Sequence, residues 1–443
     1  MTNDMTRGRI LPQLIGFTIP LVLGNLFQLT YNAADSMIVG RYLGGQALAA
    51  VGTAGPIMNL AILFISGMCM GAGILMSTQY GAKQQDVLER QISTTLLSGL
   101  VFSFFVTLSM MVLAKPVLTL IRVPEEILDS ACGYLRIIFT GFLFTFAYNF
   151  FSSTLRALGD SKASLYFLVI SSVFNIAGDL LFVAVFRWGV NGSALATVLS
   201  QMICCLCCMI YIQKKVPLLR LGKRWLIFDK RLLSRTFSFG ITSALQLMCV
   251  QLGKVCVQSM VNMQGIAFMA AFTAVNRVDD FALTPQQNIA HAATTFMVQN
   301  KGAGQEKRMK QGFFCGVLVE LCYTAAVGSC VFLFAEPIMK LFLPEESAEV
   351  IVLGVTYLQL ISFLYLLSGS GNIVQGFFRG IGDLKVTLIS SLLNISVRVI
   401  AVFFMLQVSN GGFGCLAWAC CFGWISMNLL EIPLLIKKIR SMK

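Results

Sequence analysis

The sequence has few charged residues for its length. Of its 443 residues, 12% are Asp, Glu, Lys or Arg and only one is His, whereas an ordinary soluble domain has about 25% charged residues. Hydrophobic residues make up 57% of the chain, and the mean hydropathy is +0.79. This composition excludes a soluble globular protein and indicates a polytopic membrane protein. The excess of 33 basic over 20 acidic residues does not indicate nucleic-acid binding, because the basic residues occupy short gaps between long apolar runs.

Three functional signals are also missing. No G-x-x-x-x-G-K-[ST] loop occurs, and the gaps between apolar runs are too short for a nucleotide-binding domain. The dense cysteine group at 204–208 has no second ligand pair, so we interpret it as small apolar packing and not as a metal site. Arg7 and Arg9 precede an apolar run that is too long for a signal peptide and has no cleavage site. Neither direct ATP coupling nor a cleaved leader is therefore expected.

Apolar segments long enough to cross a membrane recur along the whole chain. A membrane-spanning helix needs about 20 apolar residues. The sequence has twelve such segments, at 13–39, 46–76, 91–113, 127–151, 163–186, 191–213, 236–262, 266–298, 312–334, 349–372, 386–407 and 413–436. We therefore predict an all-α polytopic membrane protein with 12 transmembrane helices.

The distribution of Lys and Arg predicts the orientation. With the N-terminus in the cytoplasm, the inner loops and tails contain 24 of these residues and the outer loops contain 5. Eight of the 24 lie in the connection at 214–235. Because cytoplasmic loops are enriched in basic residues, both termini are expected on the cytoplasmic side.

Short motifs recur in the same order at an offset of 220 to 223 residues. The clearest pairs are Ala114-Lys115-Pro116 with Ala335-Glu336-Pro337, Pro124-Glu125-Glu126 with Pro344-Glu345-Glu346, and Arg156-x-x-Gly159-Asp160-x-Lys162 with Arg379-x-x-Gly382-Asp383-x-Lys385. Six spans per half is an even number, so the two halves have the same orientation. We predict two six-helix bundles, residues 1–220 and 221–443, related by a pseudo-twofold axis along the membrane normal. The Gly-Asp pair in the third motif also suits a helix end followed by a new N-cap.

Four polar residues in the first half are predicted at similar heights in the outer half of the membrane: Asp35, Asn175, Asp179 and Thr197. Asn175 and Asp179 are one helical turn apart and share a face. Acids within spans are costly unless they face a cavity or a partner. Oxygen ligands of this kind suit Na⁺, and two close carboxylates can also hold a proton, so the residues do not choose between H⁺ and Na⁺ at Asp35 and Asp179. The alternative is that each acid makes an ordinary hydrogen bond between helices.

The second half lacks these acids. At the same offsets it has Val257, Arg398, Val402 and Cys420. It has instead a charged cluster in the middle of the span at 266–298. We expect Arg277 to pair with Asp280 at i, i+3, which leaves Asp279 to face a cavity. The candidates for lining a substrate cavity are Arg277, Asp279, Asp280, Lys254 and Arg398, and the alternative is a structural salt-bridge cluster.

Pro20 lies within the first span. Because proline removes a backbone hydrogen bond, it should bend this helix and is a candidate hinge.

These motifs resemble the prokaryotic branch of the multidrug and toxic compound extrusion (MATE) family over nearly the whole length. The resemblance rests on PLVLGNLFQLTYNAADSMIVG at 20–40, the paired Arg-x-x-Gly-Asp-x-Lys loops, Asn175-x-x-x-Asp179 and Ala196-Thr197. It implies cation-driven drug antiport, with the cation site of the N-terminal half at Asp35, Asn175, Asp179 and Thr197. The cluster around Asp279 is not a general mark of that family.

The expected function is that of a secondary active antiporter working by alternating access, not that of an enzyme. It would export organic cations or amphipathic drugs in exchange for H⁺ or Na⁺, without any cofactor, as a monomer in the lipid bilayer of a bacterial cytoplasmic membrane. The main alternative is a flippase or exporter for lipid-linked oligosaccharides or metabolites, which the acidic or mixed cavity candidates disfavour. A third alternative is an intramembrane prenyltransferase, which would need a second acidic cluster near the cytoplasmic face to hold Mg²⁺ and diphosphate. The position of Asp179 in the outer half of the membrane argues against this alternative.

Overall fold

A computed structural model of the chain describes residues 4–217, 226–342, 348–408 and 412–442. All regular secondary structure in these ranges is helical, which confirms the predicted fold class. The elements are α1 (Ile10–Gly81), α2 (Gln85–Leu120), α3 (Glu125–Thr140), α4 (Phe142–Ala157), α5 (Ser161–Asp179), η1 (Leu180–Val185), α6 (Gly189–Lys215), α7 (Lys230–Asn262), α8 (Ile266–Gly302), α9 (Glu306–Leu333), α10 (Ala335–Phe342), α11 (Ala348–Ile381), α12 (Leu384–Phe403), η4 (Phe404–Val408) and α13 (Cys415–Ser441).

The helices account for the twelve predicted spans. Within the described ranges, nine helices are long and apolar enough to cross a membrane, and the pair α3 and α4, bent by 47°, makes a tenth span. α1 has 72 residues and contains two of the predicted spans. α8 has 37 residues and is long enough to span a membrane. It is not among the nine, because its charged cluster makes it less apolar. The short α10 and the π-helical segments η1 and η4 were not predicted.

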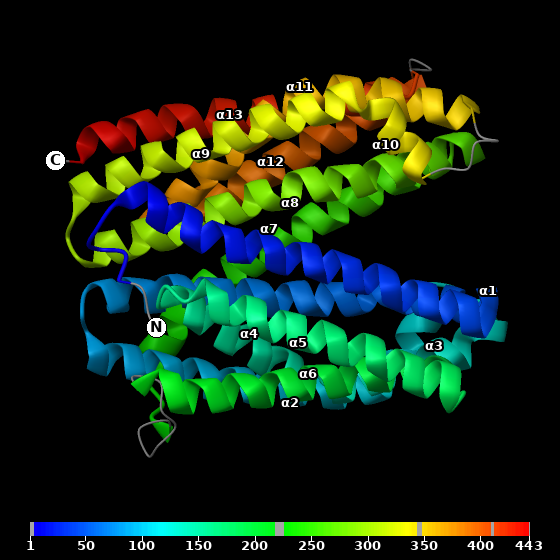
Figure 1. Cartoon of the computed structure of the whole chain (residues 1–443), viewed down its shortest axis with the longest axis horizontal. Coiled ribbons are helices and arrows are strands. Elements are labelled where there is room, and N and C mark those ends of the chain that lie inside the picture. The colour runs from blue at the N-terminus through cyan, green and yellow to red at the C-terminus, as the bar shows by residue number, and fades with distance from the viewer. Residues whose placement is uncertain (1–3, 218–225, 343–347, 409–411, 443) are drawn as a thin grey trace. The chain divides into compact units, whose positions relative to one another are not determined.

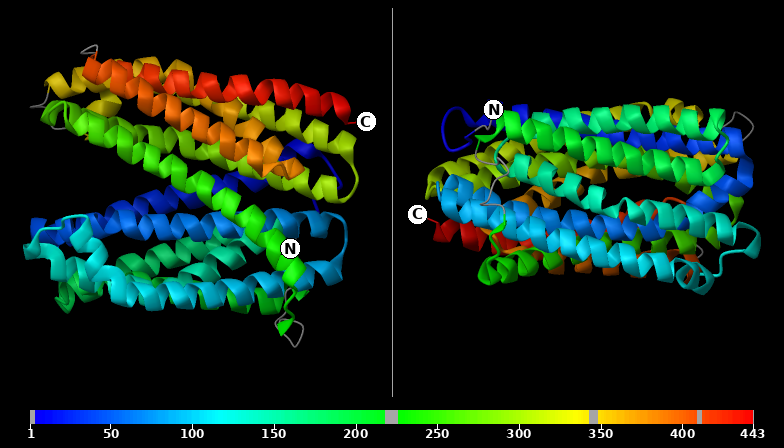
Figure 2. Two further views of the ribbon diagram at one scale, coloured as in Figure 1. Left: turned by 180° about the vertical axis from the view of Figure 1, so that it is seen from behind. Right: turned by 90° about the horizontal axis from the view of Figure 1, so that it is seen from below.

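The first two spans are joined without a polar loop. The break within α1 is at Gly44, whose φ of 81° and ψ of −176° are not helical, and a glycine adopts this conformation without a steric penalty from a Cβ atom. Figures 1 and 2 show the chain doubling back between the two parts of α1. Pro20 lies within continuous helix, so its role as a hinge stays a prediction.

The chain divides into two compact units. The first contains Ile19–Ala244, and the second contains Met5–Thr18 and Leu245–Lys443. α1 and α7 therefore contribute residues to both units. In the first unit α6 packs against α3, α4 and α5, and in the second unit α11 packs against α8, α9, α12 and α13. The boundary of the sequence repeat at residue 220 stays a prediction.

The repeated Gly-Asp pair forms a helix end and a helix start in both halves. Gly159 and Gly382 have φ values of +85° and +82°, in the region that favours glycine. Asp160 caps α5, because its Oδ1 atom accepts a hydrogen bond from the backbone N–H of Ala163 at 3.1 Å. Asp383 occupies the same position before α12 without a side-chain cap bond. The motif Pro344-Glu345-Glu346 lies outside the described residues, as does part of the basic connection at 214–235.

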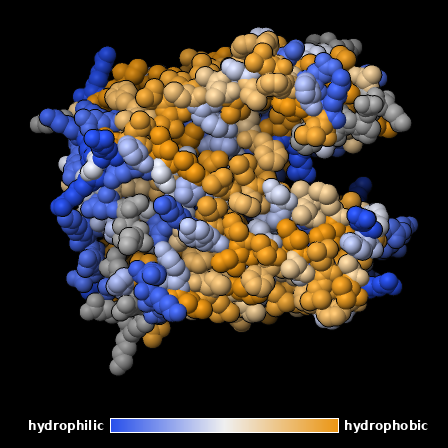
Figure 3. Space-filling model, in the orientation of Figure 1, coloured by the Kyte–Doolittle hydropathy of each residue, from blue (hydrophilic) through white to orange (hydrophobic). Residues whose placement is uncertain are grey.

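The surface agrees with a chain that crosses a membrane. Figure 3 shows hydrophobic residues covering the middle of the helices in view and hydrophilic residues gathered toward their ends. Many large apolar side chains are more than a third exposed, among them Phe104, Phe105, Val112 and Phe363. Such exposure is expected where lipid, and not water, surrounds the protein.

The segment before α1 is held against the second unit by Arg308. Its guanidinium donates to the backbone oxygen of Met5 at 3.2 Å and of Gly8 at 2.8 Å, and to Oε1 of Gln13 at 3.0 Å. It also lies 5.2 Å from the centre of the Phe296 ring. Met5 is 1% exposed, so this terminal segment is a packed part of the structure.

We expect Arg308→Ala to loosen this segment. Loss of these hydrogen bonds should cost about 1–3 kcal/mol locally. In the purified protein, trypsin should then cleave after Arg7 and Arg9 faster than in the wild type. Lys307→Ala, at an exposed neighbouring position, is the control and should leave the cleavage rate unchanged. Equal rates in all three proteins would show that Arg308 does not hold the segment.

Candidate functional site

Two polar side chains on α5 face α6 in the first unit. Asn175 and Asp179 are one helical turn apart and are 3% and 0% exposed. The Nδ2 atom of Asn175 donates a hydrogen bond to Oγ1 of Thr197 on α6 at 3.2 Å. The predicted proximity of Asn175, Asp179 and Thr197 is therefore present in the structure.

Asp35 joins this group from α1. Ser193 on α6 donates from Oγ to Oδ1 of Asp35 at 2.9 Å, and the carboxyl groups of Asp35 and Asp179 are close enough to interact electrostatically, with Ser193 beside them. The sequence analysis missed Ser193. It lies four residues before Thr197 and hence on the same face of α6, so helical periodicity was a signal that could have found it.

Three oxygen atoms in this site are left without donors. Oδ1 of Asn175 and both carboxylate oxygens of Asp179 are buried and have no hydrogen-bond partner among the residues that the structure describes. A buried carboxylate without a partner is costly. A proton or a small monovalent cation at this site would remove this cost.

The backbone around Asp179 explains why these groups lie close together. A Cβ atom on Gly178 would lie 2.9 Å from the Cβ of Ala196, so the absence of a side chain there allows α5 and α6 to approach closely. The π-helix η1 begins directly after Asp179, and such segments often occur at functional sites. α12 is followed by η4 in the same way.

In the second unit the buried acid Asp279 has hydrogen-bond partners for its carboxyl group. Asp279 is 8% exposed and accepts hydrogen bonds from the hydroxyl groups of Tyr357 at 2.8 Å and Tyr365 at 2.7 Å. Arg398 on α12 is close enough to interact with it electrostatically. The expectation that Asp279 is free to face a cavity is therefore wrong, because two tyrosines of α11 already occupy both of its oxygens.

The predicted pair of Arg277 with Asp280 is also wrong. Asp280 forms an ion pair with Lys254 of α7 at 3.2 Å, and the two side chains are 37% and 49% exposed. Arg277 is exposed and has no such ion pair among the described residues. The i, i+3 rule considers a single helix, whereas the neighbouring helix α7 supplies the counter-charge here.

Two further buried acids were missed by the sequence analysis. Glu320 on α9 is 1% exposed and Glu431 on α13 is 0% exposed. Glu431 lies beside Gln375 and Ser390 and interacts electrostatically with Arg379. Both residues lie within predicted spans. An acid inside a span is costly, and this is the signal that singled out Asp35, so it could have singled out these two residues as well.

We expect Tyr365→Phe to destabilise the second unit. It removes one of the two donors to the buried Asp279 carboxyl, at a cost of about 1–3 kcal/mol. Thermal unfolding in detergent should show a lower midpoint than the wild type. Tyr166→Phe, at a position on α5 that is 62% exposed, should leave the midpoint unchanged. An unchanged midpoint for Tyr365→Phe would show that its hydroxyl contributes nothing to the fold.

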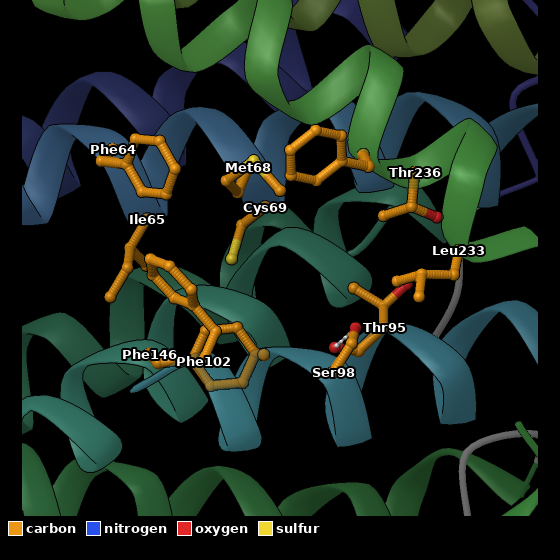
Figure 4. Close-up of a pocket in the computed structure, with 12 residues that line it drawn as sticks. Phe64, Ile65, Met68, Cys69, Thr95, Ser98, Phe102, Phe146, Leu233 and Thr236 are labelled. Carbon is orange, nitrogen blue, oxygen red and sulfur yellow. Dashed lines mark hydrogen bonds between the residues drawn. The ribbon is translucent and has the colours of Figure 1, made fainter. Parts of the chain in front are cut away.

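An apolar pocket lies elsewhere in the first unit. It has a volume of about 120 Å³ and is lined by residues of α1, α2, α4 and α7. Figure 4 shows the rings of Phe64, Phe102 and Phe146 with Met68 on one side and the hydroxyl groups of Thr95, Ser98 and Thr236 toward the other. A lining of this kind suits an aromatic or aliphatic group. None of the predicted site residues lines it.

Fold and site together define a polytopic α-helical membrane protein made of two six-helix repeats, with a buried group of carboxyl, amide and hydroxyl side chains in the first. The MatE family model matches residues 20–181 and 242–404. The chain belongs to this family, the MATE transporters.

Similar proteins agree with this assignment. The chain is 32% identical over 400 residues to the probable multidrug resistance protein YpnP of Bacillus subtilis, covering 89% of this chain and 88% of that protein. It is 30% identical over 398 residues to the probable multidrug resistance protein YoeA of the same organism, covering 88% and 86%. A solved structure described as the outward-facing conformation of a multidrug resistance MATE family transporter has a TM-score of 0.92 at 21% identity, covering 99% of this chain and 98% of that one. At this identity the structural likeness supports the fold.

Proposed function

We propose that this protein is a secondary active antiporter that exports organic cations or amphipathic drugs in exchange for H⁺ or Na⁺. The observation that carries the proposal is the unpartnered carboxyl group of Asp179 beside Asp35. By contrast, the buried acid Asp279 of the second unit is bonded to two tyrosines, with an arginine nearby. The names of the similar proteins, which refer to multidrug resistance, support the same class of substrate.

The coupling ion would bind at Asp35, Asn175, Asp179 and Thr197. Ser193 orients Asp35, and Asn175 is held by Thr197. An ion drives a conformational change only if it binds the two states of the transporter with different affinity. Filling this pocket from outside would favour one state, and emptying it toward the cytoplasm would reset the cycle. Each unit charge crossing about 100 mV contributes roughly 2.3 kcal/mol.

The remaining candidates divide by their accessibility. Lys254, Asp280 and Arg277 are exposed enough to contact a substrate, and we propose them for that role. Asp279 and Arg398 are engaged within the second unit, and we propose that they shape its interior. We further propose that the protein acts as a monomer in a bacterial cytoplasmic membrane with both termini in the cytoplasm, since the basic loops support this orientation.

Reconstituted vesicles test the proposal directly. Vesicles loaded with a fluorescent organic cation are given a pH gradient in one arm and a Na⁺ gradient in the other. We expect the dye to move against its own gradient in one arm, which would also identify the coupling ion. Protein-free vesicles are the control. Dye movement in neither arm would contradict drug antiport and favour the alternative of a flippase or metabolite exporter.

A further inference from the structure

Glu320 is a buried acid with no assigned role. It lies on α9 in the second unit and is 1% exposed. Neither of its carboxylate oxygens has a hydrogen-bond partner within the part of the chain that the structure describes. By contrast, Asp279 in the same unit has two tyrosine donors.

Uncharged polar side chains lie near this carboxyl group. Gly369 on α11 leaves room for it, because a Cβ atom at that position would lie 2.8 Å from Oε1 of Glu320 and 2.8 Å from Oγ1 of Thr324. Gln286 of α8 donates to Thr324 at 3.4 Å. Asn372 of α11 in turn donates to Gln286 at 3.5 Å. Thr324, Gln286 and Asn372 thus form a chain of uncharged hydrogen-bonding groups that begins one helical turn from Glu320.

The first unit shows that the fold does not need an acid here. Gly99 and Phe146 lie 221 and 223 residues before Glu320 and Gly369, at the offset of the repeat. A Cβ atom on Gly99 of α2 would lie 1.9 Å from the Phe146 ring of α4. In the first unit the aromatic ring therefore occupies the space beside the glycine. The second unit reverses the arrangement, with glycine on α11 and a carboxyl group on α9. An apolar pair therefore suffices for packing, and the acid has another reason to be present.

Within the described ranges, no basic group interacts with the ionised form of Glu320. The titratable group that interacts with it is Tyr323 on the same helix, whose hydroxyl donates to the backbone oxygen of Ala282 at 3.0 Å. Gly369 of α11 lies against it, the hydroxyl of Thr324 lies one turn further along α9, and the uncharged amide of Gln286 on α8 donates to that hydroxyl. Burying a lone carboxylate in a membrane protein is expensive, so a bound cation is needed to neutralise it.

We propose that Glu320 is a second cation site of this transporter, one that binds a proton, located in the second unit and separate from the group at Asp35 and Asp179. A proton fits better than Na⁺, because one carboxyl and one hydroxyl supply few of the oxygen ligands that a hard metal cation requires. The proton exchanges with solution when water reaches Glu320, and the carboxyl group stays protonated while it is shut off from water. Glu320 then contributes its own proton to the transport cycle.

Infrared difference spectroscopy of the purified full-length protein tests this proposal without any substrate. The spectrum at acidic pH minus that at alkaline pH should contain a band from a protonated carboxyl group that is lost in Glu320→Gln. Glutamine has the same shape but cannot ionise, so the variant should fold, and its thermal midpoint is measured beside the spectra. An identical set of bands in wild type and Glu320→Gln would overturn the proposal.

Two controls separate this site from the others. Glu431→Gln removes another buried acid, one with Arg379 nearby, and should leave the Glu320 band in place. Asp179→Asn should also retain it, so a failure of the proposed antiport function would not remove the signal. The measurement is repeated with Na⁺ or choline as the only added cation. Loss of the Glu320 band at constant pH in Na⁺ alone would overturn the proton assignment and identify a sodium site.

Discussion

Replacing Asp179 by Asn should abolish gradient-driven efflux, and replacing Asp35 by Asn should do the same. Asn keeps the size of the side chain and can fill the same space, but it neither exchanges a proton in this pH range nor supplies a negative charge to Na⁺. Asp179 is fully buried with both oxygens unpartnered, so the substitution removes a costly group and the protein should still fold. Uphill dye movement should fall to the level of protein-free vesicles.

Downhill movement of the dye distinguishes loss of coupling from loss of the protein. A variant that has lost only its coupling ion should still bind substrate, which tryptophan fluorescence or dye polarisation can measure. The matched control is Asp129→Asn, at a surface carboxyl on α3 that is 89% exposed and paired with Lys115. Such a pair contributes little, so this variant should transport normally. Full uphill efflux in both Asp35→Asn and Asp179→Asn would rule out coupling through this pocket.

Introducing a large side chain at Gly67 should disrupt the first unit. A Cβ atom there would lie 2.3 Å from the backbone Cα of Ala244, and one at Gly71 would lie 2.5 Å from the backbone of Gly240. The two pairs of small residues, each four positions apart, let α1 and α7 pack backbone against backbone. Gly67→Leu must push these helices apart, and overpacking of this kind typically costs about 1–3 kcal/mol.

Thermal unfolding in detergent measures the effect of Gly67→Leu. We expect a lower midpoint and poorer recovery of monodisperse protein. Gly55→Leu is the control on the same helix, because nothing lies within 4 Å of a Cβ atom at Gly55, and it should behave as the wild type. Equal stability of the two variants would show that the close crossing of α1 and α7 is not required for folding.

The sequence was sufficient for the outline of the fold. Twelve apolar runs predicted twelve spans, because a helix must hide its backbone polar groups from lipid over a fixed thickness. The Gly-Asp turns were predictable as well, since a positive φ and an N-cap each demand particular residues. Gly44 and α10 lie in the gaps between predicted spans, at 40–45 and 335–348. What the sequence did not show is that α1 continues through the first gap as one element and that the second gap contains a short helix.

Buried charges were only partly predictable. A charge in an apolar run was enough to single out Asp35, Asp179 and Asp279, and the same rule could have included Glu320. The partners of these charges could not be deduced in the same way. Within one helix, Arg277 was the natural partner of Asp280, but the structure pairs Asp280 with Lys254.

What the sequence by itself determined is therefore the number, type and order of the membrane helices, because these depend on local apolar length and on turn residues. Tertiary structure alone decided which buried groups remain without a partner. Tyr357 and Tyr365 reach Asp279 across 78 and 86 residues of chain, while Asp179 and Glu320 have no such donor among the described residues. The physical reason is that hydrogen bonds require atoms within about 3 Å of each other, and such distances depend on how each helix is rotated against its neighbours.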